Sequence, residues 1–119
     1  MSIKQGKIWG STKEIKSTEN FSLHRLCINK GGTCSKHKHN FKINGFFVES
    51  GRLLIRTWKD DQGLIDKTIL EDYDYTEVAA LQYHQFEALE DTICYEFYFN
   101  NPLSEDIFRE TQGFIKDDK

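Results

Sequence analysis

Several kinds of residue and segment are scarce in this sequence of 119 residues, and each scarcity argues against a class of protein. No apolar run is long enough to span a membrane, and we find no N-terminal signal segment. The formal net charge is −3 without a basic stripe, so we do not expect a nucleic-acid binder. Only three cysteines occur, Cys27, Cys34 and Cys94, an odd number at irregular spacing. This usage predicts reduced thiols in a cytoplasmic protein.

Two common catalytic arrangements are also missing. The acidic residues are scattered, without paired carboxylates at fixed spacing, so glycosidase-like chemistry has no support. No glycine-rich loop joins a strand to a helix, which argues against nucleotide binding through such a loop, and Gly31-Gly32 is interpreted as a turn. The length favours a single domain over residues 1–119.

The sequence is rich in short alternating runs of β-branched and aromatic residues. Glycine-containing turns at Gly31-Gly32, Gly51 and Gly63 separate several of these runs. Many short strands with such turns predict an all-β sandwich or barrel. The predicted strands cover residues 21–29, 45–49, 53–58, 64–70, 76–80, 83–87 and 92–99.

The two ends of the chain differ from this core over residues 21–99. Residues 1–20 are polar and predict an N-terminal arm of loop character. Residues 100–119 predict a short helix and a tail. The helix is expected near residues 104–110, because Ser104 can cap its first turn and Glu105 and Asp106 suit the positive end of its dipole.

His37 and His39 are the first candidate site residues. On a strand, two residues separated by one position point to the same side, so the pair would aim two imidazoles at one point. Asn44 follows after four residues, which lets the chain turn and return a third polar group on the next strand. Gly51 comes seven residues later, at a predicted hairpin turn.

This pattern resembles the first signature motif of the cupins, which runs glycine, five residues, His-x-His, three or four residues, glutamate, six residues and glycine. Gly31, His37, His39 and Gly51 match it, whereas Asn44 stands where the family usually has glutamate. The second cupin motif is represented only by His84. The resemblance covers roughly residues 25–99. It implies the cupin jelly-roll barrel, also called a double-stranded β-helix.

The resemblance also implies a metal site made by His37, His39 and His84. The expected cofactor is a divalent transition metal, either zinc, iron, nickel or manganese, since imidazole suits several metals. Three protein ligands leave positions open for water or substrate. Asn44 brings no negative charge, so the metal would keep its full charge. Chance His-x-His pairs are common, but the glycine spacings favour a metal site; His24, outside both motifs, is expected to be structural.

Strand parity predicts the walls of the site. If the parity of His37 and His39 resumes at Asn44, Phe46 also points inward, while Gln82 and Phe86 share the parity of His84. Tyr95 and Glu96 lie on opposite faces of the last strand, and a buried tyrosine near a metal could act as general acid or base. Simple core packing explains the apolar positions equally well. The candidate substrate-binding residues are Asn44, Phe46, Gln82, Phe86 and Tyr95.

The leading functional hypothesis is a small metal-binding cupin that acts on, or binds, a small polar metabolite. Trp9-Gly10 resembles the opening of mannose-6-phosphate isomerase-type cupins, which implies a sugar or sugar phosphate. Two alternatives remain open: a non-enzymatic ligand-binding or accessory cupin, and a three-histidine iron dioxygenase. The sequence does not decide whether the protein is an enzyme. A homodimer is expected, because small cupins commonly pair and the aromatic content is high, with Trp9, Phe47, Trp58 and Tyr98 as candidate contacts.

Overall fold

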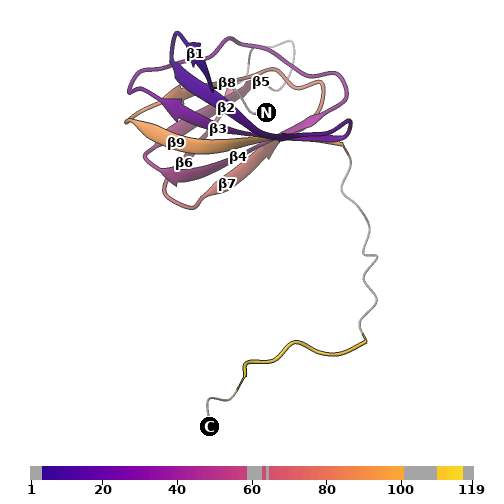
Figure 1. Ribbon diagram of the computed structural model, residues 1–119. Coiled ribbons are helices and arrows are strands. Elements are labelled where there is room, and N and C mark those ends of the chain that lie inside the picture. Colours follow the sequence, from indigo (N-terminus) through magenta and orange to yellow (C-terminus); the bar gives the residue numbers. More distant parts are fainter. Residues whose placement is uncertain (1–3, 59–62, 64, 101–109, 117–119) are drawn as a thin grey trace.

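The chain folds into two antiparallel β-sheets (Figure 1). The computed structural model describes residues 4–58, 63, 65–100 and 110–116, and nine strands lie in these ranges. The larger sheet has the order β1-β2-β3-β9-β4-β7, and the smaller has the order β6-β5-β8. The strands are β1 (Lys4–Lys7), β2 (Gly10–Ser17), β3 (Phe21–Ile28), β4 (Ile43–Ser50), β5 (Leu53–Trp58), β6 (Ile65–Leu70), β7 (Tyr75–Val78), β8 (His84–Ala88) and β9 (Thr92–Phe99).

The core lies between the sheets and follows from the alternation within the strands. Every second residue of the central strands points inward, and the inward set is mostly apolar, with Asn44, His84 and Thr92 as buried polar members. This arrangement confirms the predicted all-β fold with two packed antiparallel sheets. The core consists of Leu26, Ile28, Cys34, Phe46, Val48, Leu53, Ile55, Leu70, Val78, Phe86, Ala88 and Cys94, with Trp9 packed against it.

The connection at Gly51 differs from the predicted hairpin. It joins β4 of the larger sheet to β5 of the smaller one, and these two strands do not pair. Gly51 has a φ of +112°, and a Cβ atom there would lie 2.5 Å from the carbonyl oxygen of Asp91. Glycine is therefore required because the chain bends sharply against the β8–β9 connection as it crosses between the sheets.

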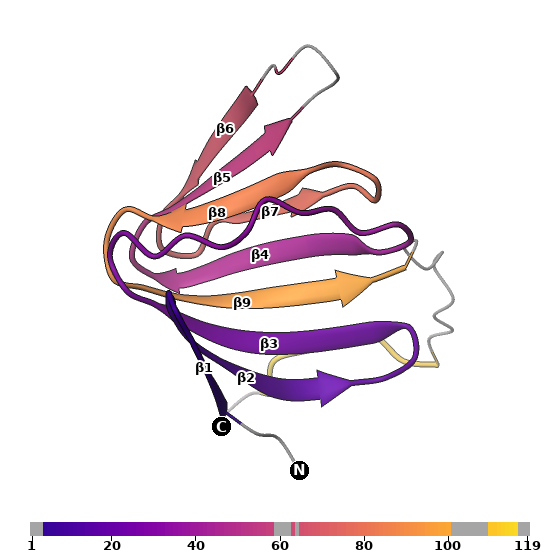
Figure 2. The ribbon, with the colours of Figure 1, turned by 90° about the horizontal axis from the view of Figure 1, so that it is seen from above.

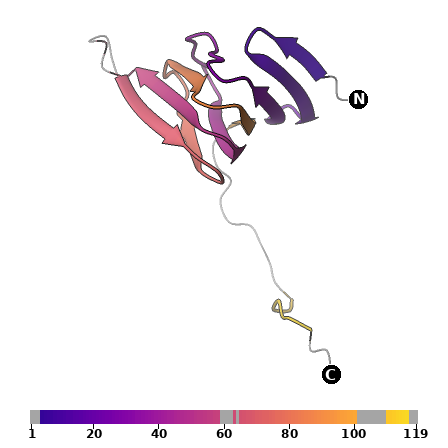
Figure 3. The ribbon, with the colours of Figure 1, turned by 90° about the vertical axis from the view of Figure 1, so that its left-hand side faces the viewer.

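The N-terminal segment is not the predicted loop, because residues 4–17 contain β1 and β2. These strands extend the larger sheet at the side farthest from β5 and β6 (Figures 2 and 3). The smaller sheet does not cover this side, so β2 needs no alternating apolar residues, and its side chains are exposed or half-buried. The polar composition that indicated a loop therefore reflects an uncovered pair of strands.

The helix expected near residues 104–110 falls outside the described residues, apart from Glu110. The described C-terminal residues, 110–116, form no regular structure and are exposed. Within the parts of the chain that the structure describes, no helix has the length and apolar character needed to cross a membrane.

Candidate metal centre

His37 and His39 lie on the segment between β3 and β4. We predicted a strand here, but the segment does not form one. It pairs with β8 only through isolated bridges, between Thr33 and Glu87 and between His37 and His84. At the second bridge, the His37 amide donates to the His84 carbonyl oxygen at 3.0 Å, and the His84 amide donates back at 2.8 Å. This exchange fixes His37 beside His84.

The cause of the interrupted pairing is visible between the two bridges. The Phe86 backbone amide donates to the Sγ atom of Cys34 at 3.1 Å, and the Gln85 side-chain amide donates to the Cys34 carbonyl oxygen at 3.0 Å. The Cys34 amide still donates to the Phe86 carbonyl oxygen at 3.2 Å, but the Phe86 amide bonds to the Cys34 sulfur in place of a backbone acceptor. The segment therefore stays extended without forming a strand.

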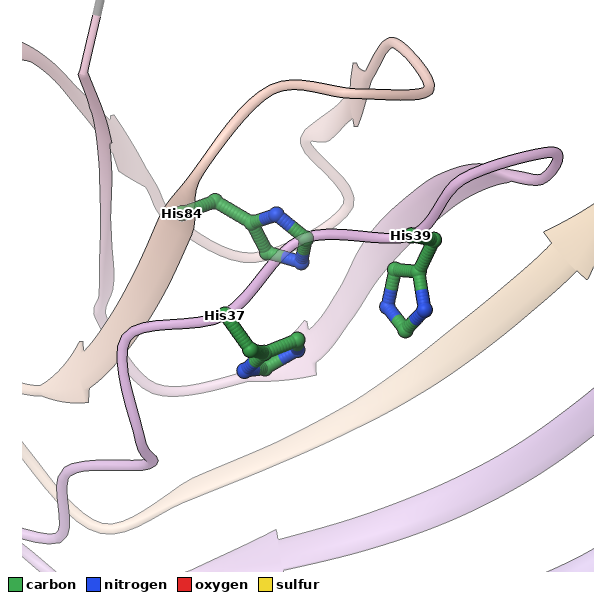
Figure 4. Close-up of side chains that lie close together, drawn as sticks. All are labelled: His37, His39 and His84. Atoms are coloured by element: carbon green, nitrogen blue, oxygen red, sulfur yellow. The ribbon is translucent and has the colours of Figure 1, made fainter.

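The three imidazole rings converge (Figure 4). One ring nitrogen from each of His37, His39 and His84 lies within 4.8 Å of the others. The ring centroids are 4.5 Å apart for His37 and His84, 5.1 Å for His37 and His39, and 5.4 Å for His39 and His84. His84 is buried, and the other two are half-buried. The residues brought together are those predicted from the cupin motifs.

Backbone carbonyls fix the tautomers of two of these rings. The Nδ1 atom of His37 lies 2.8 Å from the Ser35 carbonyl oxygen, and that of His84 lies 3.0 Å from the Gln82 carbonyl oxygen. A carbonyl oxygen only accepts, so Nδ1 carries the proton in each neutral ring and Nε2 holds a lone pair. The Nε2 atom of His39 is buried and has no hydrogen-bond partner within the described structure. Each of the three rings thus has one nitrogen available to bind a metal ion.

Asn44 completes the set from β4. Its side chain is fully buried, and its Nδ2 atom donates to the Phe97 carbonyl oxygen at 3.1 Å. This bond directs Oδ1 toward His84, where it lies 2.9 Å from Nε2. Both atoms then present lone pairs to each other. Two acceptor atoms at this distance could both bind one cation. Neighbouring ligand atoms that each lie about 2.1 Å from a metal ion are about 3 Å from each other. The donor set therefore fits a divalent metal.

The histidines favour the neutral form that a metal requires. Burial lowers the pKa of His84 to about 4, and His37 and His39 add to this effect. The pKa of His39 is also lowered, first by burial and then by His37 and Lys42. A neutral imidazole can bind a cation without first releasing a proton, so binding by these two rings costs no deprotonation near pH 7.

A cavity of about 330 Å³ adjoins the histidines. Its lining includes His37 and Ser35, and Glu96 and Tyr98 of β9. The Tyr98 ring meets the His39 ring edge-on, with centroids 4.9 Å apart. The cavity therefore borders the candidate metal centre at His37.

The predicted wall residues fall into three groups. Phe46 and Phe86 point inward as predicted: Phe46 packs 6.4 Å from the His84 ring, and Phe86 lines the cavity. Gln82 contributes its carbonyl oxygen to His84, and its side chain is not part of the cavity lining. Tyr95 is placed on the opposite face of the sheet, where its hydroxyl donates to Glu49 at 2.9 Å. The prediction that Tyr95 belongs to the site is therefore wrong, because its side chain lies on the outer face of the larger sheet.

The sequence left open whether Tyr95 or Glu96 faces inward, and it suggested Tyr98 as a dimer contact and His24 as a structural residue. The structure places Glu96, Tyr98 and His24 in the lining of the cavity. Burial raises the pKa of Glu96 to about 7, while hydrogen bonds from Tyr98 and Asn44 oppose the rise. Burial and the neighbouring Glu96 also raise the pKa of Tyr98. The alternation along β9 could have indicated these two residues, because Glu96 and Tyr98 share one face of that strand with Thr92.

No family model matches the sequence, and the search of curated proteins found no match. The structure does have similar solved structures. KdgF from Halomonas sp. has a TM-score of 0.71 at 16% identity, covering 84% of this chain and 89% of KdgF. Oxalate decarboxylase from Bacillus subtilis, described for its Mn(II) centres, has a TM-score of 0.73 at 15% identity.

The capsular polysaccharide assembling protein CapF from Staphylococcus aureus has a TM-score of 0.72 at 21% identity. This chain spans 28% of the oxalate decarboxylase and 30% of CapF, so it corresponds to less than a third of each. In both comparisons 87% of this chain is covered. These proteins have the cupin fold, and the fold expected from the His-x-His motif is thereby confirmed.

Proposed function

We propose that this protein is a metal-binding cupin, with His37, His39 and His84 as ligands and the Oδ1 atom of Asn44 as a fourth. The unused lone pairs carry the proposal. The His39 Nε2 atom is buried without a partner within the described structure, and His84 Nε2 faces Asn44 Oδ1 at 2.9 Å. A buried acceptor without a donor is costly, and a cation would satisfy all of these atoms together.

We further infer that the protein binds or transforms a small polar metabolite, with sugars and sugar phosphates as first candidates. The cavity of about 330 Å³ is at the small end of the range for ligand pockets. A divalent metal there would polarise a ligand oxygen. Glu96 and Tyr98 lie beside it and could exchange a proton with the ligand, since they share a hydrogen bond. The similarity to a capsular polysaccharide protein supports the sugar class.

Two alternatives follow from the uncharged ligand set. Asn44 in place of glutamate favours a protein that binds its ligand without catalysis, because an amide tunes a metal less strongly than a carboxylate does. Three neutral imidazoles would equally suit an iron dioxygenase. Iron together with ligand-dependent oxygen consumption would select the dioxygenase. Another metal, with ligand binding but no turnover, would select the binding protein.

The experiment begins with elemental analysis of the freshly purified full chain, followed by a calorimetric screen of sugars and sugar phosphates. The His84→Ala variant is the matched control. We expect about one divalent ion per chain in the wild type and little in the variant. Ligand binding should depend on the metal. A wild type that takes up no divalent ion at neutral pH would refute the metal proposal.

The homodimer remains a proposal. Of its four candidate contact residues, Trp9 and Tyr98 line the cavity, and Trp58 lies under Lys36 with the ammonium 4.2 Å from the ring centroid. Phe47, by contrast, belongs to a group of aromatic side chains on the outer face of the larger sheet. Its ring contacts those of Tyr73 and Tyr95. A monomer mass in sedimentation at high micromolar concentration would contradict pairing through this face.

A further inference from the structure

The cavity has a second wall, formed by the β1–β2 hairpin. Gln5 and Lys7 of β1 and Thr12 of β2 line it. Gln5 pairs with Thr12, and Lys7 pairs with Gly10. Paired residues share a face of an antiparallel sheet, and so do residues two apart on one strand. The three polar side chains therefore form one continuous surface.

Strand register places this surface on the inner face of the sheet. Thr12 pairs with Leu26 of β3, and Leu26 is buried in the core. The hairpin wall thus continues the same face that is apolar in the middle of the sheet. Polar side chains on an exposed strand are ordinary in themselves. Here, however, they border a cavity that also contains the metal-centre residue His37.

His24 connects the two walls. Its ring lies 6.0 Å from that of Tyr98, and the Tyr98 ring lies 4.9 Å from that of His39. The Nδ1 atom of His24 is buried and unpartnered within the described structure, while its Nε2 atom lies 4.0 Å from Glu14. The surface between the hairpin and the metal centre therefore has hydrogen-bonding capacity that the described residues do not use.

The balance of charge around the cavity is positive once a metal is bound. Three neutral imidazoles and one amide leave the charge of a divalent ion uncompensated. Lys7 adds a positive charge on the hairpin wall. Among the described lining residues Glu96 is the acidic one; it is hydrogen-bonded to Tyr98 and Asn44 and lies within electrostatic range of Lys7. Glu14 lies 4.0 Å from His24. A divalent ion together with Lys7 still outweighs these two carboxylates. Such a cavity favours an anion over a neutral molecule.

We propose that the cavity binds a small anionic ligand whose carboxylate or phosphate group lies at Lys7, with Gln5 and Thr12 as hydrogen-bond partners. The volume of about 330 Å³ limits the ligand to about the size of a single sugar unit. This inference rests on the proposed metal-binding function, whose ion supplies most of the positive charge.

The test uses the metal-loaded full chain and three probes in calorimetry: glucose 6-phosphate, glucuronate and glucose. We expect at least one of the anions to bind at least about tenfold more tightly than glucose. Preference for glucose 6-phosphate would assign a phosphate ligand, and preference for glucuronate a carboxylate. Glucose binding as tightly as both anions, or no binding of either anion, would overturn the inference.

Two lysine variants locate the anionic group. Lys7→Met keeps an apolar stem but removes the charge, and we expect about fivefold weaker anion binding with unchanged metal content. Lys13→Met is the matched control, because Lys13 lies on the same hairpin next to Thr12 and therefore on the opposite face. Equal effects of the two changes would contradict the assignment to Lys7. Absence of metal in the wild type would defeat the proposed function and this inference together, whereas metal uptake without anion preference would defeat the inference alone.

Discussion

The two halves of the inner face of the larger sheet differ in what covers them. Around β4 and β9 the smaller sheet packs against this face, and the inward residues, such as Phe46, Val48 and Cys94, are fully buried. Around β1 and β2 the smaller sheet gives no such cover (Figure 3), and the inward residues are polar, among them Gln5, Lys7 and Thr12. Strand pairing continues through both halves.

The difference separates the part of the fold that supplies stability from the part that we propose to bind a ligand. The covered half supplies the apolar contacts that hold the sheets together. The histidines lie at the boundary, where His84 is buried on the covered side and His37 faces the cavity. The uncovered half contributes little to the core and so is free to carry polar groups for a ligand. Changes in the two halves should therefore affect different measurements.

The largest expected effect is on stability, from Phe46→Ala in the covered half. Removing this buried ring leaves a cavity in the core, so we expect the free energy of unfolding to fall by about 3–5 kcal/mol. Thr12→Ala in the uncovered half is the comparison, and its effect should stay within about 0.5 kcal/mol. Urea unfolding followed by fluorescence measures both. Similar losses in the two variants would show that the hairpin is part of the core.

The second prediction compares two histidines across the boundary. His84→Ala removes a buried residue that we propose as a metal ligand, and it should lower metal affinity at least about hundredfold. His24→Ala, on the other side of Tyr98, should leave metal affinity nearly unchanged, since His24 is not in the cluster. Competition with a chelating dye gives both affinities. Loss of the metal in His24→Ala as well would contradict a site made by His37, His39 and His84.

Acid should destabilise the metal-free protein. The pKa values of His24, His39 and His84 are lowered in the folded state, that of His84 to about 4. The unfolded chain then binds more protons, so stability is complete above about pH 6.5 and declines as pH falls toward 4. Glu96, with its pKa raised to about 7, acts in the opposite direction. Glu96→Gln should therefore steepen the decline, as measured by urea midpoints at pH 7 and pH 5.

The smallest expected effect concerns Asn44. Asn44→Ala removes one amide oxygen and should weaken metal binding about tenfold, well below the effect of losing a histidine. Asn44→Glu introduces the carboxylate usual in cupins and should tighten binding, because an anionic ligand offsets the charge of the metal. Chelator competition again gives the measurement. Weaker binding by Asn44→Glu than by Asn44→Ala would show that Asn44 does not face the ion.

The covered half and the histidine cluster could be predicted from the sequence, whereas the uncovered half could not. Phe46 and Val48 follow period-two alternation, and the glycine spacings brought His37 and His39 into a known motif. The hairpin was missed because strands without a cover need no apolar pattern, so Gln5 and Thr12 gave a loop-like signal. Tyr95 was misplaced because only the register of β9 against β4 decides which of its faces turns inward.

We propose that three imidazole nitrogens and the Asn44 oxygen surround one metal ion at the boundary between the two halves. X-ray absorption spectroscopy of the metal-loaded protein examines this coordination, because it reports the number and type of ligand atoms. We expect three imidazole nitrogens with the remaining ligands oxygen, and two imidazoles after His37→Ala. A sulfur ligand, which Cys34 at the cavity wall would supply, or fewer than three imidazoles in the wild type would contradict it.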